Sequence, residues 1–314
     1  MGIKNLMQII KRYCPEAILY KKITDYKNNH VAIDANLLIY KSIYAIRKNG
    51  YDLKNGDIIV THIYSLLQKI IGLIKYNITP VFVFDGIAPK IKKETLNKRK
   101  KFSDLMKLKY TKAITQDEKK KYFFMKSDIS FNEVEECKQL IELFGFSIIE
   151  SPEEADAQLA YLSKNGIVDY IITDDMDILI FGGERLLKNF TISDKKKIQE
   201  INLDIILAKL NITQDELIEL GILLGCDYCP SIAGIGTIGA YKLIKKYKNL
   251  DNMMAENIIK LNISHYKSID YFKNPPIIEI KKINQLNINY TELVKFLKKF
   301  NYTDEFIKKI INKI

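Results

Sequence analysis

The chain has 314 residues, of which 47% are hydrophobic, and a formal net charge of +11. This length and hydrophobic content allow one large core or two modest ones, which excludes a disordered protein. No apolar run approaches the ~20 residues of a membrane span, and Met1-Gly2-Ile3-Lys4 does not begin a signal peptide, so we expect a soluble intracellular protein.

The basic residues are distributed unevenly along the chain. Of the 49 Lys and Arg residues, only four are Arg. Residues 90–126 contain 14 Lys or Arg and 4 Asp or Glu, a local balance of +10, whereas the rest of the chain is nearly neutral at +1. A codon bias toward lysine would have spread these residues evenly. The block is therefore either an element that binds an anionic partner such as nucleic acid, or a solvated face.

Cysteine and histidine are too sparse to predict a zinc centre. Cys14 and Cys137 are isolated, Cys226 and Cys229 form a single Cys-x-x-Cys pair, and the chain has three His. Structural zinc sites need four such ligands at regular spacing. We therefore interpret the four cysteines as reduced thiols.

Strands and helices are predicted to alternate along the first half of the chain. Short apolar runs predict buried strands at 30–34, 79–85, 145–150 and 170–173. Amphipathic segments between them predict helices over 35–48, 58–76, 131–144 and 152–164. This alternation predicts an α/β fold with a central, mostly parallel sheet flanked by helices on both faces. In such a sheet, ligands bind beyond the carboxyl ends of the strands.

Acidic residues follow the first three predicted strands. Asp34 ends the first strand and Asp85 ends the second. After the third, Ser151 and Glu154 have the spacing of a capping box, and Asp156 follows in the same helical turn. Capping alone would explain Glu154, but it does not explain why acids recur at each strand end.

The fourth strand leads into a cluster of three acids, Asp174, Asp175 and Asp177. In an extended segment Asp175 and Asp177 point to one side and Asp174 to the other. These carboxylates repel one another between two apolar runs, and burying one unpaired charge is costly. A cation is therefore expected beside them.

A glycine-spaced turn follows later in the chain. Asp227 comes after an apolar helix, and Gly234-Ile235-Gly236 precedes a Lys-rich helix that contains Lys242. This order is typical of a helix-hairpin-helix element, in which the amides of the turn hold a DNA phosphate.

Collected at one edge of the sheet, the acids would form a cluster of seven carboxylates: Asp34, Asp85, Glu154, Asp156, Asp175, Asp177 and Asp227. Hard divalent cations with oxygen ligands, Mg²⁺ or Mn²⁺, would relieve their repulsion. Two such ions ~4 Å apart are the usual apparatus for phosphodiester hydrolysis. The sequence therefore predicts a two-metal nuclease.

Motifs along nearly the whole chain resemble those of the flap endonuclease family of structure-specific 5′ nucleases. They are "MGIKNL", "VAIDANLLIY", "VFDG", "EEADAQLA", "TDDMD", "LGCDYC", "GIGTIGA" and the closing segment "TELVKFLKKFNYTDEFIKKIINKI". The resemblance implies a PIN-like nuclease core with a helical arch and a helix-hairpin-helix element. The implied organisation is an N-terminal nuclease region, a basic arch, an internal nuclease region, a helix-hairpin-helix and C-terminal helices packing on the core, over 1–100, 90–130, 131–225, 226–260 and 261–314.

The resemblance also implies roles for single residues. A first metal cluster would comprise Asp34, Asp85, Glu154 and Asp156, and a second would comprise Asp175, Asp177 and Asp227, while Asp174 would not be a ligand. Flap endonucleases usually carry Glu where Asp156 stands, and "EADAQLAYL" is similar to the related exonuclease branch.

Lys92 and Arg99 are seven residues apart, so a helix would present them on one face. By the resemblance they would reach from the arch to the scissile phosphate; the alternative is that they belong to a solvated basic face.

The resemblance implies contacts for further residues. Tyr40 matches a residue that stacks on a base beside the cut, and Arg47 matches a phosphate contact. The turn near Ser231 would hold K⁺. Aromatic residues of the block would stack on a threaded strand or hold the arch together: Phe102, Tyr110, Tyr122, Phe123 and Phe124.

The leading hypothesis is a Mg²⁺-dependent nuclease that cuts branched DNA near the junction of a 5′ flap, during replication, repair or recombination. The alternatives are a 5′–3′ exonuclease or a gap or junction endonuclease of the same superfamily, or a catalytically silent DNA-binding scaffold. We expect a monomer in the nucleus or at another site of DNA replication. The chain ends at Ile314, without the extension that carries the family's sliding-clamp motif, so docking by that route is not expected.

Overall fold

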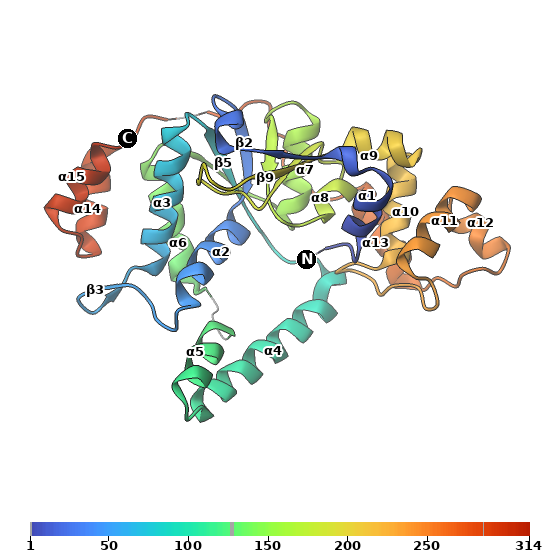
Figure 1. The fold of residues 1–314 in the computed structure, drawn as a ribbon, viewed down its shortest axis with the longest axis horizontal. Helices are drawn as coiled ribbons and strands as arrows, with labels where there is room; N and C mark the ends of the chain where they lie inside the picture. Colours follow the sequence, from blue (N-terminus) through green and yellow to red (C-terminus); the bar gives the residue numbers. More distant parts are fainter. Residues whose placement is uncertain (1, 126–128, 285) are drawn as a thin grey trace.

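The computed structural model of the chain describes residues 2–125, 129–284 and 286–314 (Figure 1). Its centre is a seven-stranded sheet with the order β1-β9-β8-β7-β2-β5-β6. The strands are β1 (Ile18–Lys21), β2 (His30–Asp34), β5 (Thr79–Phe84), β6 (Ser147–Glu150), β7 (Tyr170–Ile172), β8 (Arg185–Lys188) and β9 (Ile198–Asn202). The five strands from β8 to β6 are parallel, and β9 pairs antiparallel with both β8 and β1. The predicted α/β class with a mostly parallel sheet is confirmed.

Each central strand contributes side chains to two hydrophobic cores. In β2, Val31 and Ile33 pack into one core and Ala32 into the other. The first core lies against the helices α2 (Ala35–Arg47), α3 (Thr61–Lys75), α6 (Phe131–Leu143), α14 (Tyr290–Lys299) and α15 (Asp304–Ile311). The second lies against α7 (Ala155–Lys164). The alternation of strand side chains therefore covers the sheet on both faces, as expected for parallel strands.

A third core lies beyond the β1–β9–β8 end of the sheet. It gathers helices that are far apart in the sequence: α1 (Leu6–Tyr13), α8 (Asp177–Ile180), α9 (Leu203–Leu210), α10 (Gln214–Leu224), α11 (Thr237–Tyr247), α12 (Leu250–Ala255) and α13 (Ile263–Lys273). Figure 1 shows α11 and α12 at the outer end of this group. In the described parts of the chain, no helix has both the length and the apolar character required to cross a bilayer.

Several strands were not predicted. Five strands lie outside the four predicted runs: the edge strand β1, the pair β8 and β9, and the hairpin of β3 (Lys54–Asn55) and β4 (Ile58–Ile59). In β9 the polar residues Gln199 and Glu200 are buried. Glu200 is paired with Lys21 at 2.8 Å and accepts a hydrogen bond from Tyr26 Oη at 3.1 Å. Because β9 buries polar residues in these contacts, its hydrophobic pattern does not predict a strand.

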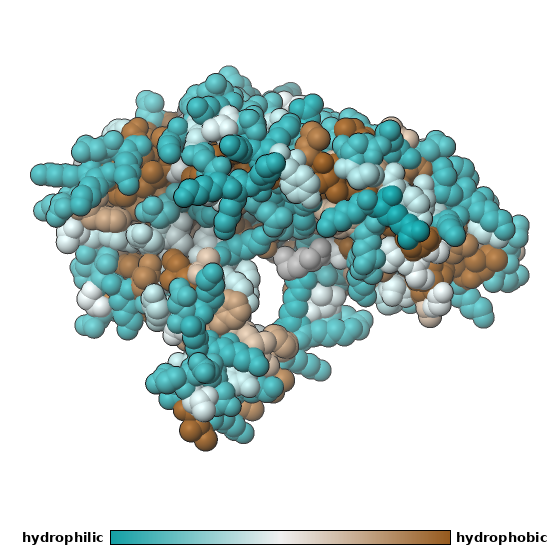
Figure 2. All heavy atoms as spheres, viewed as in Figure 1, coloured by the Kyte–Doolittle hydropathy of each residue, from teal (hydrophilic) through white to brown (hydrophobic). Residues whose placement is uncertain are grey.

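The basic block forms a helical arch. A short 3₁₀ turn, η3 (Lys90–Lys92), leads into α4 (Lys93–Lys112) and then α5 (Gln116–Met125), which project from the body (Figure 1). Along α4 only Met106 is buried, so the charged residues of this helix face solvent. Figure 2 shows a largely hydrophilic arch and an opening between it and the body. The aromatic pair Tyr110–Phe123, with ring centroids 5.9 Å apart, joins its two helices.

Candidate active site

The first two acids lie at the carboxyl ends of neighbouring parallel strands. Asp34 is the N-cap of α2: its Oδ1 accepts from Leu37 N at 2.9 Å, and its Oδ2 accepts from Thr173 Oγ1 at 2.9 Å. Asp85 directly follows β5, and its Oδ1 accepts from Ala155 N at 2.9 Å. These bonds fix one carboxylate beneath each strand end and leave further oxygen lone pairs available.

Glu154 and Asp156 stand at the start of α7, but the predicted capping box is wrong. The helix begins at Ala155, with Glu154 as its N-cap and no side-chain capping bond. Ser151 instead continues the pairing with β5, because its N and Oγ both donate to Phe84 O, at 2.9 and 2.7 Å. Since neither Ser151 nor a backbone amide holds it, the Glu154 carboxylate can point to the site.

The three acids after β7 do not lie in the extended segment that the sequence predicted. Asp177 begins α8, and its Oδ1 accepts from Ile3 N at 2.7 Å, while Asp175 Oδ1 accepts from Asp177 N at 3.1 Å. Asp174 is held elsewhere, by an ion pair with Lys41 and by Asn189 N at 2.7 Å. A turn followed by a helix, rather than strand alternation, therefore separates Asp174 from the other two.

Asp227 lies where the base of the arch meets the body. Arg99 Nη2 is 2.5 Å from Asp227 Oδ2, and Lys92 Nζ is 3.7 Å from the same oxygen. Lys92 also forms an ion pair with Glu154. Burial alone would lower the pKa of Lys92, but Glu154 and Asp227 raise it overall, so the ammonium stays charged. The two predicted arch cations thus reach one acid cluster together.

The acids of the cluster influence one another's pKa values. Burial is the largest cause that raises the pKa of Asp156 and Asp177 well above the ordinary value, and the charge of Asp175 is the next. Burial also raises the pKa of Glu154, against the opposing effect of Lys92. Among the charges acting on these groups are those of Asp34, Asp85 and Asp227. The structure therefore brings the predicted acids into one frustrated cluster.

The donor set fits hard divalent cations, since it consists of carboxylate oxygens with basic side chains only at its rim. In residues 2–125, 129–284 and 286–314, no group of three or more acid, His or Cys side chains is arranged as a ready set of metal ligands. Protein donors engage several of the carboxylates instead, such as Ile3 N on Asp177 and Lys92 on Glu154.

The metal-free protein should lose stability as the pH rises, because burial and then Asp85 raise the pKa of Asp34 to about 7. An acid with a raised folded-state pKa contributes its stabilisation fully below its ordinary pKa, and this is lost as the pH rises through the folded value. We expect the free energy of unfolding, measured with denaturant and chelator, to fall between about pH 4 and about pH 7. The fall should be smaller for Asp34→Asn; an equal fall in both proteins would contradict this origin.

Gly2 lies against the acid cluster, and the sequence reasoning assigned it no role. Its φ is +81°, and a Cβ there would lie 2.0 Å from Asp175 Oδ1 and 2.4 Å from Asp177 Oδ1. Only glycine fits this approach. No local pattern marks it, because the contact depends on the segment before α1 returning to the turn after β7.

Gly2→Ala should therefore displace the two carboxylates. Displacement of catalytic groups by ~1 Å lowers the rate of the chemical step by about tenfold or more. We therefore expect slower single-turnover cleavage with little change in flap affinity. Gly166→Ala is a matched control, because Gly166 also has a positive φ, +65°, but a Cβ there would meet nothing within 4 Å. If both variants were less stable but cleaved at the wild-type rate, the contact of Gly2 with the acids would not contribute to catalysis.

The glycine-spaced turn precedes α11 as predicted. Gly234 has φ +79°, which glycine adopts readily, whereas Gly236 is the N-cap of α11 with φ −81°. A Cβ at either position would be in open space. On α11, Lys242 is exposed, while Lys245 donates to Leu210 O and Asn211 O at 3.1 Å. The turn therefore presents uncrowded backbone beside an exposed ammonium group.

Tyr40 and Arg47 both lie on α2 but differ in environment. Tyr40 is 42% exposed and stacks on Tyr44 with ring centroids 5.4 Å apart, and Tyr44 stacks on Phe124 of the arch at 3.7 Å. The Arg47 side chain is 9% exposed and pairs with Asp52 at 2.7 Å and Glu133 at 3.0 Å. The Tyr40 ring is therefore accessible from solvent, whereas the Arg47 guanidinium is held in a buried ion-pair network.

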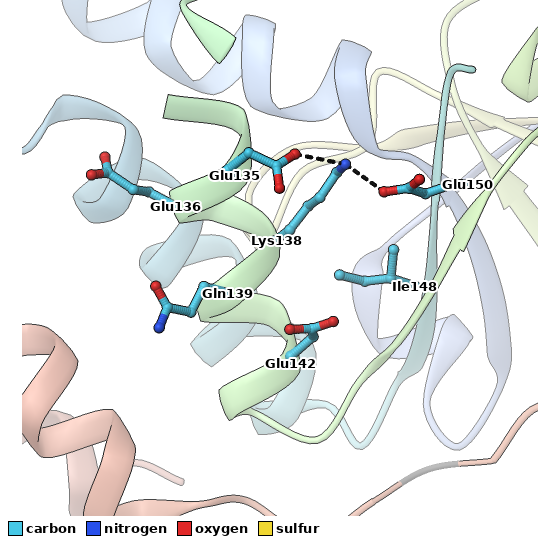
Figure 3. A pocket seen from close by; sticks show the side chains of 7 residues that line it. All are labelled: Glu135, Glu136, Lys138, Gln139, Glu142, Ile148 and Glu150. Atoms are coloured by element: carbon cyan, nitrogen blue, oxygen red, sulfur yellow. Dashed lines mark hydrogen bonds and ion pairs between the residues drawn. The ribbon is translucent and has the colours of Figure 1, made fainter. Parts of the chain in front are cut away.

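A separate hollow of about 370 Å³ lies between α6 and β6. Figure 3 shows its lining residues, Glu135, Glu136, Lys138, Gln139, Glu142, Ile148 and Glu150. Lys138 bridges Glu135 at 2.8 Å and Glu150 at 2.6 Å. The remaining charge of this hollow is negative and would repel DNA phosphates, and none of the seven cluster acids lines it.

Comparison with known proteins identifies the family of the chain. Residues 1–106 match the XPG N-terminal domain and residues 145–227 match the XPG I-region. Flap endonuclease 1 of Enterocytozoon bieneusi is 39% identical over 259 residues, which cover 81% of this chain and 72% of that relative.

Solved structures share the fold. Flap endonuclease-1 from Methanococcus jannaschii has a TM-score of 0.73 at 29% identity, with 94% of each chain covered. The catalytic core of Rad2, solved in complex with a DNA substrate, has a TM-score of 0.78 at 24% identity over all of both chains, a likeness that shows the fold alone. With its relatives and its matched domains in agreement, the chain belongs to the flap endonuclease family, whose members are structure-specific 5′ nucleases that hydrolyse phosphodiester bonds in branched DNA.

Proposed function

We propose that this chain cuts branched DNA near the junction of a 5′ flap, acting as a monomer with two divalent ions held by its acid cluster. The observation that carries the proposal is the convergence of acids from four strand ends and the Asp227 turn beneath the arch cations Lys92 and Arg99. Nucleases of this family are generally metal-dependent, and the oxygen-only donor set suits Mg²⁺, with Mn²⁺ as a substitute.

The division of the acids between two ions rests on the resemblance to the flap endonuclease family. One ion would be held by Asp34, Asp85, Glu154 and Asp156, and the other by Asp175, Asp177 and Asp227. When bound, the ions would supply an activated water and charge stabilisation for the leaving oxygen. Several of the acids would exchange a protein partner, such as the Lys92 ammonium on Glu154, for an ion.

The chain's own residues would bind and orient the substrate. On release from Glu154 and Asp227, Lys92 and Arg99 can turn to the scissile phosphate and stabilise its developing charge. The exposed ring of Tyr40, supported by Tyr44, would stack on a base beside the cut. The opening under the arch offers a path for the single-stranded flap (Figure 2).

The helix-hairpin-helix element would grip duplex phosphates at a distance from the cut. The amides at Gly234 and Gly236 and the ammonium of Lys242 are the proposed contacts, and by its family likeness the turn near Ser231 would hold K⁺. Gly236→Phe should raise KM more than it lowers kcat, because such a contact is made equally in the ground and transition states. A Cβ at this position meets no atom within 4 Å, and thermal unfolding of the variant checks that it folds. An unchanged KM would count against this turn as a DNA contact.

Substrate preference is tested with end-labelled 5′-flap, gapped, nicked, blunt-duplex and Holliday-type DNA in Mg²⁺, with products sized at nucleotide resolution. We expect the fastest cleavage on the flap, within a few nucleotides of its junction. Stepwise release of mononucleotides from the blunt duplex at an equal rate would instead identify a 5′–3′ exonuclease. Paired cuts across the four-way junction would identify a junction endonuclease.

A further inference from the structure

The turn that carries Asp227 is closed by two cysteines. Cys226 and Cys229 flank it, with their Sγ atoms 3.6 Å apart, and Cys226 N donates to Cys229 O at 3.0 Å. Both are free thiols, 9% and 5% exposed respectively. A disulfide has its sulfurs about 2.05 Å apart, so bonding requires them to approach by about 1.5 Å within one short turn.

We propose that Cys226 and Cys229 are a modification site: they form a reversible disulfide, and the oxidised turn displaces Asp227 and switches off hydrolysis. This inference rests on the proposed role of Asp227 in the nuclease site. The disulfide would make the rate of hydrolysis depend on the redox state of the surroundings, which the acids and the arch cations alone do not do.

The turn has little freedom to absorb the movement without shifting Asp227. Gly225, just before it, has φ +82°, and a Cβ there would lie 2.4 Å from Ser231 N, so the turn packs closely against its own continuation. Asp227 O accepts from Thr95 Oγ1 at 2.7 Å, and its carboxylate holds Arg99. Contraction between the two sulfurs would therefore move both the acid and its contacts at the base of the arch.

The oxidation balances with a small-molecule disulfide as the oxidant. The thiolate of one cysteine attacks a sulfur of that disulfide, which forms a mixed disulfide and expels one small thiol. The second cysteine then attacks the protein sulfur of the mixed disulfide, forming the Cys226–Cys229 bond and expelling the second small thiol. Two protein thiols are oxidised and the small disulfide is reduced to two thiols. The protons lost by the two cysteines are taken up by the two small thiolates that leave. A dithiol reverses both steps.

The other two cysteines provide internal controls. Cys14 and Cys137 are each fully buried, and they lie in two different hydrophobic cores. Neither flanks a residue of the acid cluster in the sequence. Oxidation that acts through the Asp227 turn should therefore not depend on either of them.

The test treats the full chain with oxidised glutathione, removes it, and measures single-turnover flap cleavage in Mg²⁺. Differential alkylation with peptide mass spectrometry maps the disulfide independently of activity. We expect a Cys226–Cys229 bond and a rate about 10²-fold lower, the scale of a ~1 Å misplacement, with full recovery in dithiothreitol. In Cys226→Ser and in Cys229→Ser the remaining thiol can proceed no further than a mixed disulfide with glutathione, so neither variant should form the intramolecular bond. The fraction of each variant whose remaining thiol is unmodified should cleave at the reduced rate. The ratio of oxidised to reduced rates should stay as in the wild type in Cys137→Ala.

Three results would overturn the inference while the reduced enzyme remains active. They are no Cys226–Cys229 bond at any excess of oxidant, a mapped bond with an unchanged rate, or an equal loss in serine variants whose remaining thiol is unmodified. A reduced wild type that cleaves no branched DNA would overturn the proposed function, and with it the consequence assigned to the disulfide. The disulfide map and the reduced rate therefore separate the two failures.

Discussion

Asp177→Asn should lower flap cleavage by ~10³-fold or more, because metal assistance contributes several kcal/mol of transition-state stabilisation. The substitution removes a charge but keeps a side-chain oxygen that can accept from Ile3 N, as Asp177 Oδ1 does at 2.7 Å. Flap affinity should stay within a few-fold of the wild type, because most affinity for DNA comes from phosphate contacts elsewhere. Single-turnover rates in Mg²⁺ and binding in chelator separate the two effects.

Thermal unfolding in chelator distinguishes this loss from misfolding. Burial and the charge of Asp175 raise the pKa of Asp177, so removing its charge relieves repulsion and should leave the melting temperature of the metal-free variant equal or higher. Asp174→Asn is the matched control, because Asp174 lies in the same turn but pairs with Lys41. It should keep wild-type activity within a few-fold. Normal cleavage by Asp177→Asn, or full wild-type activity in excess chelator, would contradict the two-metal assignment.

The acid cluster was predictable because its members follow a simple rule of position. Asp34 and Asp85 directly end or follow apolar strands, and parallel strands bring their carboxyl ends to one edge. The arch was predictable from charge, since α4 buries only Met106 and the block is biased toward lysine. Such features depend on local pattern and on one topological rule, and both can be read from a sequence.

The missed features depend on contacts between distant segments. Gly2 meets Asp175 and Asp177 only because the start of the chain returns to the turn after β7. The ion pairs of Arg47 with Asp52 and Glu133 were likewise not predicted, and the role of Arg47 as a phosphate contact stays a prediction. A side chain's exposure is set by such partners, and periodicity and spacing contain no information about them.

Arg99→Ala should lower single-turnover cleavage at saturating enzyme by ~10²-fold or more, the scale of losing one preorganised charge-stabilising donor. Arg99 is one of four arginines in a chain with 49 basic residues, and its forked guanidinium suits a phosphate. Although its side chain is 46% exposed, its guanidinium reaches Asp227 at 2.5 Å, at the rim of the acid cluster. Flap affinity should change little, because many lysines share the electrostatic attraction.

Lys119→Ala is the control that separates catalysis from bulk charge. Lys119 belongs to the same basic block but lies exposed on α5, and the described contacts of its side chain include none of the cluster acids. Its loss should at most weaken binding slightly and make it more sensitive to salt, with a normal chemical step. Rates at saturating enzyme and salt-dependent affinities, measured for both variants side by side, decide between the two interpretations. If the two variants behave alike, the arch is a charged face and Arg99 has no part in the chemistry; a rate loss confined to Arg99→Ala assigns it to the transition state.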